Sequence, residues 1–241
     1  MRILLITDID GTFYTPNLSN YIDDFINLLE ENKDKIIFGL SSGRSFESIM
    51  DFIAQYNLEA YIDYIFPFLG TEIFDNRKKR FINKWNEFIS YNWDRNKVIN
   101  IINKEIPSLE LQPKSEQSEY KVSYFAYNDF SINRLIEVFR NNRVYYSFSF
   151  SHNIYLDIVP YRAIPKANSI YFLSKLLNIK YNNIYTIGDS LNDYYMLFSF
   201  KSFIVRNHTI PSEYINPCNM RILKTENSLL EVLDYIVKEI L

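Results

Sequence analysis

The chain has little cysteine, little glycine and no long apolar run. Its 241 residues include 1 cysteine and 5 glycines. Cys218 has no partner for an internal disulfide, which favours a reducing compartment. The first apolar run, residues 3–6, is too short for a secretory signal and is soon followed by Asp8. No apolar stretch approaches the roughly 20 residues that span a bilayer. We expect a soluble, cytoplasmic protein with no membrane partner.

The chain also lacks an excess of positive charge. It carries 26 basic and 29 acidic residues, a formal net charge of -3. Its only basic block is residues 77–80, for which a solvated turn is the simplest interpretation. An acidic chain of this kind is a poor nucleic-acid binder. We expect no nucleic-acid partner, and no pattern specifies an oligomeric state.

Apolar segments that alternate with amphipathic ones at both ends of the chain indicate an α/β core. Strands that are apolar on both faces are typical of a parallel sheet covered on two sides, as in Rossmann-like folds. The predicted strands are residues 2–7, 35–41, 61–69, 183–187 and 203–205. The predicted helices are residues 19–31, 45–56, 166–177, 193–200 and 228–241.

The middle of the chain has a different rhythm. Two β-rich runs, residues 144–150 and 154–159, are separated by a short polar break and predict a hairpin. A third run at 120–126 alternates loosely, and helical patterns occupy 94–105 and 131–141. This predicts an inserted α+β cap with an antiparallel sheet. The expected division is a core of residues 1–80 and 161–241, with the cap at 81–160.

Two carboxylates follow the first strand, in the sequence Asp8-Ile-Asp10-Gly11. A carboxylate can attack phosphorus to form an aspartyl-phosphate, and a neighbouring carboxyl can act as acid and base. Gly11 allows the backbone to approach a phosphate oxygen. An Asx turn is the structural alternative. A calcium loop is excluded, because its glycine and final glutamate would fall on Phe13 and Ser19.

Two further polar features follow predicted elements. Ser42 and Gly43 stand between the second strand and a helix, where a hydroxyl and free N–H groups bind phosphate. A serine N-cap is the alternative. Lys166 stands at a helix start, where a cation is unfavourable unless it neutralises an anion. The alternative is an exposed, solvated lysine.

The fourth feature is the segment Gly188-Asp189-Ser-Leu-Asn192-Asp193 after a predicted strand. Its carboxylates could complete an oxygen shell for Mg²⁺. Helix capping is the alternative, but it needs only one of these side chains. The carboxyl ends of parallel strands lie at one edge of a sheet, so all four features should meet in one crevice.

These four features, in this order, resemble the motifs of the haloacid dehalogenase superfamily of phosphatases, and the insert lies where that superfamily places its type-two (C2) cap. The resemblance implies that Asp8 is the nucleophile and Asp10 the acid/base. It also implies phosphate binding by Ser42 and Lys166.

The same resemblance implies a magnesium cofactor. Its ligands would be Asp8, the backbone carbonyl of Asp10, and Asp189. Asp193 would support this shell, and Asn192 would contribute beside the phosphate.

Several cap-associated segments are similar to the sucrose-phosphate phosphatase branch of that superfamily, among them residues 70–73, 115–117 and 156–160. Glu72, Gln117 and Lys121 are polar groups that could bind sugar hydroxyls. A rim charge and an exposed strand residue are the alternatives for Glu72 and Lys121. The chain departs from the branch at residues 118, 120, 167 and 191, and the first two of these concern sugar specificity.

The sequence therefore predicts a magnesium-dependent phosphatase that hydrolyses a sugar phosphate, such as sucrose 6-phosphate or a related ester. A sugar phosphomutase or phosphotransferase on the same fold is one alternative. A non-catalytic binding module is another, although modules of that kind normally lose the motif carboxylates, which are present here.

Overall fold

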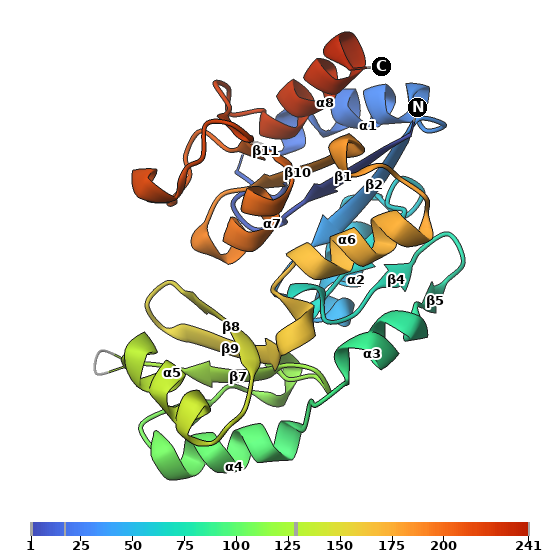
Figure 1. The fold of residues 1–241 in the computed structure, drawn as a ribbon. Coiled ribbons are helices and arrows are strands. Elements are labelled where there is room, and N and C mark those ends of the chain that lie inside the picture. Colours follow the sequence, from blue (N-terminus) through green and yellow to red (C-terminus); the bar gives the residue numbers. More distant parts are fainter. Residues whose placement is uncertain (1, 17, 128–129, 241) are drawn as a thin grey trace.

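The computed structural model describes residues 2–16, 18–127 and 130–240. Its larger lobe contains an eight-stranded sheet of order β12-β11-β10-β1-β2-β3-β4-β5 (Figure 1). The parallel strands are β1 (Ile3–Thr7), β2 (Ile36–Ser41), β3 (Tyr64–Phe66), β10 (Ile184–Gly188), β11 (Lys201–Ile204) and β12 (Met220–Ile222). Two short antiparallel strands, β4 (Phe74–Asp75) and β5 (Arg80–Phe81), extend one edge.

Helices cover both faces of this sheet, because its central strand is apolar on both sides. Ile3 and Leu5 of β1 pack with α1 (Ile22–Glu31), α2 (Phe46–Gln55) and α8 (Ser228–Glu239). Leu4 and Ile6 face the opposite layer. That layer contains α3 (Asn83–Ile89), α6 (Ala167–Leu176) and α7 (Tyr194–Ser199). The pattern predicted for a buried parallel strand is thus present in β1.

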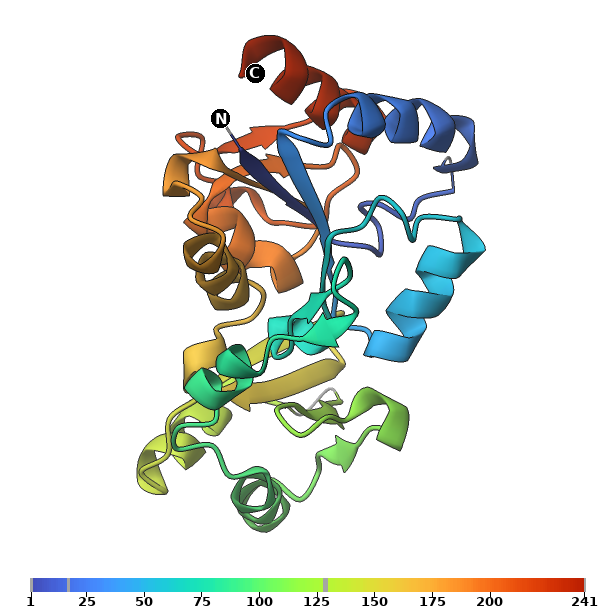
Figure 2. The same ribbon diagram turned by 90° about the vertical axis from the view of Figure 1, so that its right-hand side faces the viewer.

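The smaller lobe is an antiparallel sheet of order β6-β7-β9-β8 (Figure 2). Its strands are β6 (Glu110–Leu111), β7 (Val122–Phe125), β8 (Tyr146–Ser151) and β9 (Tyr155–Pro160). Alternate residues, including Val122, Tyr124 and Leu156, form an apolar cluster with α4 (Arg95–Glu105) and α5 (Ile132–Asn141). Since strand side chains alternate, the intervening residues lie on the other face, toward the core.

These two lobes confirm the predicted α/β core with an inserted antiparallel cap. The predicted strand at 61–69 was too long: β3 covers Tyr64–Phe66, and Phe68 and Leu69 have positive φ angles of 50° and 62°. The short elements β4, β5, β6, β12 and α3 were not predicted. Residue 241, at the end of the predicted closing helix, lies outside the described residues. The boundary near residue 80 stays a prediction, and Trp85 of α3 packs with the core cluster.

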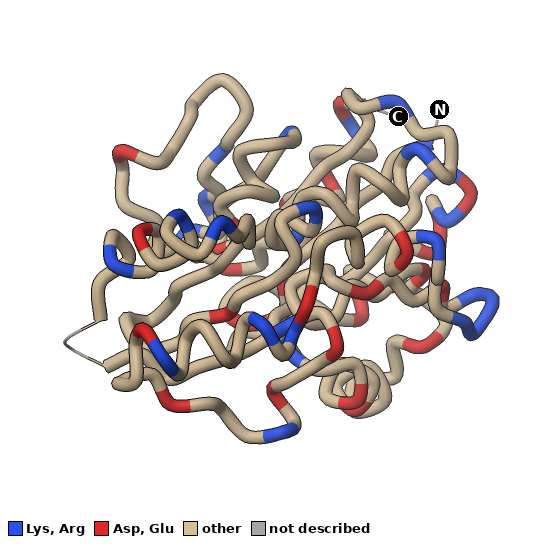
Figure 3. The backbone as a smooth tube through the Cα atoms, turned by 60° about the horizontal axis from the view of Figure 1, so that its bottom comes forward, with Lys and Arg blue, Asp and Glu red and all other residues tan. Residues whose placement is uncertain are grey.

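Charged residues of both signs are interspersed along the chain (Figure 3). Within the 77–80 block, Arg77 pairs with Asp63, and Lys78 lies 3.6 Å from the Asp75 carboxylate. Among the residues that the structure describes, no helix has the length and apolar character needed to cross a membrane.

Candidate active site

The site begins where β1 ends. Asp8 follows the strand directly, and its backbone N–H donates to the Ile187 carbonyl of β10 at 3.0 Å. This bond continues the β1–β10 pairing past the strand end and fixes the position of the Asp8 backbone. The residue is 5% exposed. The central strand pair therefore presents a nearly buried carboxylate at the carboxyl edge of the sheet.

Lys166 joins two of the carboxylates. Its Nζ lies 2.5 Å from Asp8 Oδ1 and 2.6 Å from Asp193 Oδ1. Lys166 is the N-cap of α6 with φ 61°, a backbone conformation that is costly for a non-glycine residue. Its backbone N–H donates to the Leu69 carbonyl at 2.7 Å. The exposed-lysine alternative is therefore wrong, because Lys166 is 2% exposed.

The electrostatics of this cluster follow from burial and like charge. Burial raises the pKa of Asp8 well above its usual value, against the attraction of Lys166; Asp193 and Asp189 raise it further. Burial also raises the pKa of Asp189 to about 6, with the charge of Asp193 adding to the effect. Burial alone would lower the pKa of Lys166, but the carboxylates of Asp193 and Asp8 raise it instead. The cluster holds more negative than positive charge, so a bound cation would stabilise it.

The donor set fits a hard divalent cation. Three carboxylate oxygens lie within 4.8 Å of one another, one from each of Asp8, Asp189 and Asp193. A Cβ at Gly11, which has φ 77°, would lie 2.6 Å from Asp189 Oδ2, so only glycine leaves room for that carboxylate. Oxygen ligands at this spacing suit Mg²⁺.

Both carboxylate oxygens of Asp193 accept hydrogen bonds from its surroundings. Its Oδ2 accepts from the backbone N–H groups of Asp189 at 3.1 Å and Ser190 at 3.3 Å, while Oδ1 contacts Lys166. A Cβ at Gly188 would lie 2.6 Å from the Asp193 Cβ. These contacts suit Asp193 to supporting a metal shell from behind.

Asp10 lies at the rim of the same site. Its carboxylate is paired with the Arg44 guanidinium through two hydrogen bonds, one of them 2.8 Å from Nε to Oδ2. The Asp10 side chain is 55% exposed, so it can reach a bound substrate. Arg44 comes from the loop that also contains Ser42, whose Oγ accepts the Arg44 backbone N–H at 3.2 Å. Arg44 was not predicted as a site residue, although it stands next to the predicted phosphate-binding residues Ser42 and Gly43.

These residues line one cavity of ≈ 670 Å³ between the core and the cap. Every predicted catalytic, phosphate-binding and metal-binding residue of the core lines this cavity except Asp193, which is fully buried behind the wall. The cap contributes polar and aromatic side chains, among them Lys121, Asp157, His152, Tyr155 and Phe125. The predicted crevice therefore exists, and the cap sheet forms its other wall.

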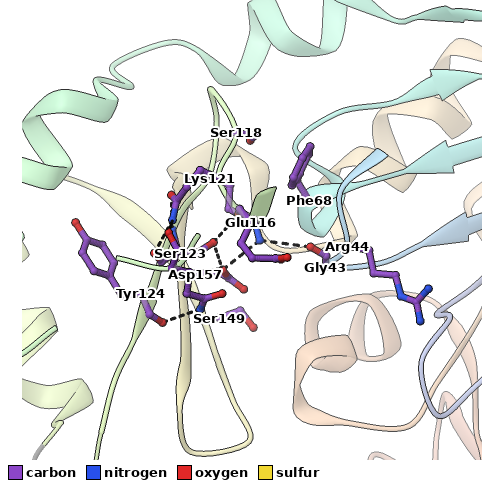
Figure 4. Close-up of polar contacts among 12 residues, drawn as sticks. Gly43, Arg44, Phe68, Glu116, Ser118, Lys121, Ser123, Tyr124, Ser149 and Asp157 are labelled. Atoms are coloured by element: carbon purple, nitrogen blue, oxygen red, sulfur yellow. Dashed lines mark hydrogen bonds and ion pairs between the residues drawn. The ribbon is translucent and has the colours of Figure 1, made fainter. Parts of the chain in front are cut away.

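Lys121 and Asp157 form a polar group on the cap wall (Figure 4). Lys121 Nζ lies 3.3 Å from Asp157 Oδ1, and Ser123 Oγ lies 2.6 Å from the same oxygen. Lys121 Nζ also donates to the Gly43 carbonyl of the core at 3.4 Å. The side chains of Lys121 and Asp157 are 2% and 15% exposed. Asp157 was missed, although it stands in a segment that resembles the sucrose-phosphate phosphatase branch.

Asn192 contacts the cap rather than its own helix. Its Oδ1 accepts a hydrogen bond from Ser149 Oγ of β8 at 2.8 Å. Ser149 was also missed, but the alternation Tyr-Ser-Phe-Ser-Phe-Ser at 146–151 is a period-2 pattern that places the serines on one face.

Glu72 and Gln117 lie outside this cavity. Gln117 donates to the carbonyls of Gln112 and Ser123 and accepts the Ser123 N–H at 3.0 Å. Glu72 lines a separate pocket with Glu119 and other residues. Burial raises the pKa of Glu72 to about 7, with help from the nearby charges of Glu47 and Glu119. The structure brings Lys121, but neither of these two, to the motif residues.

The family model described as sucrose-6F-phosphate phosphohydrolase matches residues 1–217. The chain is similar to Sucrose-phosphatase 2 of Nicotiana tabacum, with 28% identity over 202 residues, 80% of this chain and 47% of the tobacco protein. It thus spans about half the length of that relative. It is also similar to Kanosamine-6-phosphate phosphatase of Bacillus subtilis (strain 168), with 24% identity over 236 residues, 86% of this chain and 83% of the relative.

Solved structures share the fold. The sucrose-phosphatase of Synechocystis sp. PCC6803, solved with sucrose and phosphate, has a TM-score of 0.86 and 23% identity, with 98% of each chain covered. A haloacid dehalogenase-like hydrolase from Bacillus subtilis has a TM-score of 0.68 and 20% identity, covering 98% of this chain and 91% of that one.

Proposed function

Because the chain belongs to the sucrose-6F-phosphate phosphohydrolase family, within the haloacid dehalogenase superfamily of phosphatases, we propose that it hydrolyses a sugar phosphate monoester with the aid of Mg²⁺. The reaction would pass through an aspartyl-phosphate on Asp8. The observation that carries this proposal is the contact of Lys166 with both Asp8 and Asp193, at a cavity that Asp10, Asp189 and residues of the cap also line.

In the first step, a carboxylate oxygen of Asp8 attacks phosphorus and the bond from phosphorus to the sugar oxygen breaks. Asp10 donates its proton to the leaving sugar oxygen. In the structure Arg44 donates to both Asp10 oxygens, so one of these hydrogen bonds would be released for Asp10 to carry the proton and would re-form once the proton has gone to the sugar oxygen. Lys166, Ser42 and the Gly43 N–H would bind the phosphoryl oxygens, where charge is distributed in the transition state. Gly11 and Asn192, which also line the cavity, would complete the phosphate contacts.

In the second step, water attacks phosphorus and the bond to Asp8 breaks. Asp10 accepts the proton from this water, so that the acid is restored and inorganic phosphate leaves. Mg²⁺ held by Asp8, Asp189 and the Asp10 carbonyl would offset the repulsion between the Asp8 carboxylate and the phosphate dianion. Burial raises the pKa of Asp8, with Asp193 and Asp189 adding to the effect, so additional positive charge beside Asp8 would favour its carboxylate form.

The cap wall supports a sugar as the leaving group. Lys121 and Asp157 offer a donor and an acceptor beside Phe125 and Tyr155, which suits the hydroxyls and apolar face of a sugar ring. Glu72 and Gln117 would contribute only after a rearrangement of the cap. Tobacco and Synechocystis relatives named for sucrose phosphate, and a relative named for kanosamine 6-phosphate, set the range of esters to test.

The test is phosphate release from a panel of esters: sucrose 6-phosphate, kanosamine 6-phosphate, glucosylglycerol phosphate and small hexose phosphates. We expect turnover with Mg²⁺, loss of turnover with EDTA, and a fall of at least about 1000-fold in Asp8→Asn. Asp51→Asn, an exposed change on α2, is the matched control. Full magnesium-dependent activity in Asp8→Asn would overturn the mechanism.

Product analysis separates hydrolysis from transfer. Free phosphate equal to the ester consumed supports hydrolysis, whereas an isomerised sugar phosphate would identify a mutase.

The exposed single cysteine, Cys218, fits the predicted cytoplasmic location, which stays a prediction.

A further inference from the structure

We propose that Ser149 of the cap is a positioning residue for the phosphate site, acting through Asn192 of the core. This inference rests on the proposed function, because it assigns a cap residue to the binding of the same phosphate. Ser149 Oγ donates to Asn192 Oδ1 at 2.8 Å, across the boundary between cap and core. Asn192 lines the cavity, and Ser149 lies behind it as a largely buried residue, 8% exposed.

The chemistry of an amide explains why this contact matters. Asn192 has one acceptor oxygen and one donor NH₂ group, and only the donor side suits a phosphate oxygen. When the Ser149 hydroxyl occupies Oδ1, the amide is held with Nδ2 free for the anion. Without that bond, the side chain can rotate and present its oxygen to the phosphate, which is repulsive.

The place of Ser149 in the cap sheet makes the contact a consequence of cap docking. Ser149 pairs with Asp157 of β9, and Asp157 pairs in turn with Ser123 of β7, so these side chains share the face toward the core. Lys121, just before β7, donates to the Gly43 carbonyl in the other phosphate-binding loop. The loop with Gly43 and the loop with Asn192 thus each accept a hydrogen bond from the cap. The phosphate-binding groups of both loops therefore reach their full orientation only when the cap is docked.

The experiment measures inorganic phosphate binding to the magnesium-loaded protein by calorimetry, so it does not depend on turnover. We expect Ser149→Ala to weaken phosphate affinity about 5- to 10-fold. Ser149→Thr, which keeps the hydroxyl, should stay within about 2-fold of wild type. Ser147→Ala is the matched control, because Ser147 lies on the same strand face but donates to the Tyr161 carbonyl at 3.2 Å.

A double-mutant cycle tests whether Ser149 acts through Asn192. If it does, the double variant Ser149→Ala/Asn192→Ala binds phosphate no more weakly than Asn192→Ala alone. Multiplied effects in the double variant would overturn the proposal, as would Ser149→Ala binding like wild type. Absence of hydrolysis for every ester, with this binding pattern intact, would remove the proposed function and leave the positioning role standing.

Discussion

The core and the cap build opposite walls of one cavity by different means. On the core wall, charged side chains lie at the carboxyl edge of the parallel sheet and are in direct contact: Lys166, which is 2% exposed, lies 2.6 Å from the fully buried Asp193 carboxylate behind the wall. On the cap wall, polar side chains come from alternating strand positions, and Asp157 and Tyr155 remain partly accessible. The core wall therefore tolerates little change, whereas on the cap wall one buried charge, Lys121, is paired with a partly accessible carboxylate, Asp157.

The difference follows from the cost of burying charge. A buried ion pair stabilises little when it is intact, but removal of one partner leaves the other charge desolvated and unpaired. A partly exposed polar group that loses its partner can form hydrogen bonds with water instead. Variants of the core wall should accordingly affect both folding and turnover, and variants of the cap wall should affect mainly substrate binding.

Lys166→Met should give the largest effect. It leaves the Asp8 and Asp193 carboxylates buried without their cation, so we expect the free energy of unfolding to fall by about 3–5 kcal/mol and turnover to be lost. Urea denaturation in EDTA measures the stability without compensation by a metal. Lys175→Met, an exposed change on the same helix, should stay within about 0.5 kcal/mol. If Lys166→Met is as stable as wild type, the free energy lost by burying these charges equals the free energy gained from their attraction, and the prediction is wrong.

Asp157→Asn should change binding more than chemistry. It removes the negative charge that faces Lys121 but keeps an oxygen acceptor for Lys121 and Ser123. Because Asp157 contacts neither Asp8 nor Asp10, we expect KM to rise about 10-fold and kcat to stay within about 3-fold. Steady-state kinetics with the preferred ester measures both constants. Glu137→Gln, on the outer surface of α5, is the control and should alter neither. A fall in kcat at unchanged KM would place Asp157 with the reacting groups.

The two walls were also unequally predictable. Asp8, Ser42 and Asp189 follow predicted parallel strands directly, and the carboxyl ends of such strands must share an edge, whereas the place of Lys166, at a helix start, rested on the resemblance. A parallel sheet was therefore enough to predict that the side chains after its strands lie together, whatever the order of the strands.

The cap wall depended on pairing between distant segments. The patterns indicated the cap strands β7, β8 and β9, but not that β7 pairs with β9, which brings Ser123 beside Asp157. A shift of one residue in this register would turn these side chains toward α4 and α5. Gln117 shows the same limit, because its amide bonds to backbone groups of neighbouring cap segments that the sequence does not place.

Glu72→Gln tests a partly buried acid that belongs to neither wall. Burial raises its pKa from the usual 4.5 to about 7, so the folded state holds this proton more tightly than the unfolded state. The wild-type protein should then lose stability as the pH rises from about 4.5 to 7, and the loss should be complete above that range. We expect Glu72→Gln to be about 1–3 kcal/mol more stable than wild type at pH 8 and equal at pH 4.

Urea denaturation across this pH range provides the measurement. Glu87→Gln changes an exposed acid in the same pocket and should shift stability by less than about 0.5 kcal/mol at either pH. A Glu72→Gln curve parallel to that of wild type would show that the carboxyl titrates as it does in the unfolded chain.

Gln117→Ala should give the smallest effect on catalysis, and it separates two roles for one side chain. The sequence predicts a sugar contact, whereas the structure has the amide bonded to Gln112, Ser123 and Arg95 inside the cap. If the structural role holds, the variant loses about 1 kcal/mol of stability, while the ratio of kcat/KM between two sugar phosphates stays constant. Lys121→Ala, measured beside it, should change that ratio because Lys121 lines the cavity. A changed ratio in Gln117→Ala would mean that the cap rearranges around the substrate and that its sheet is a mobile part of the recognition surface.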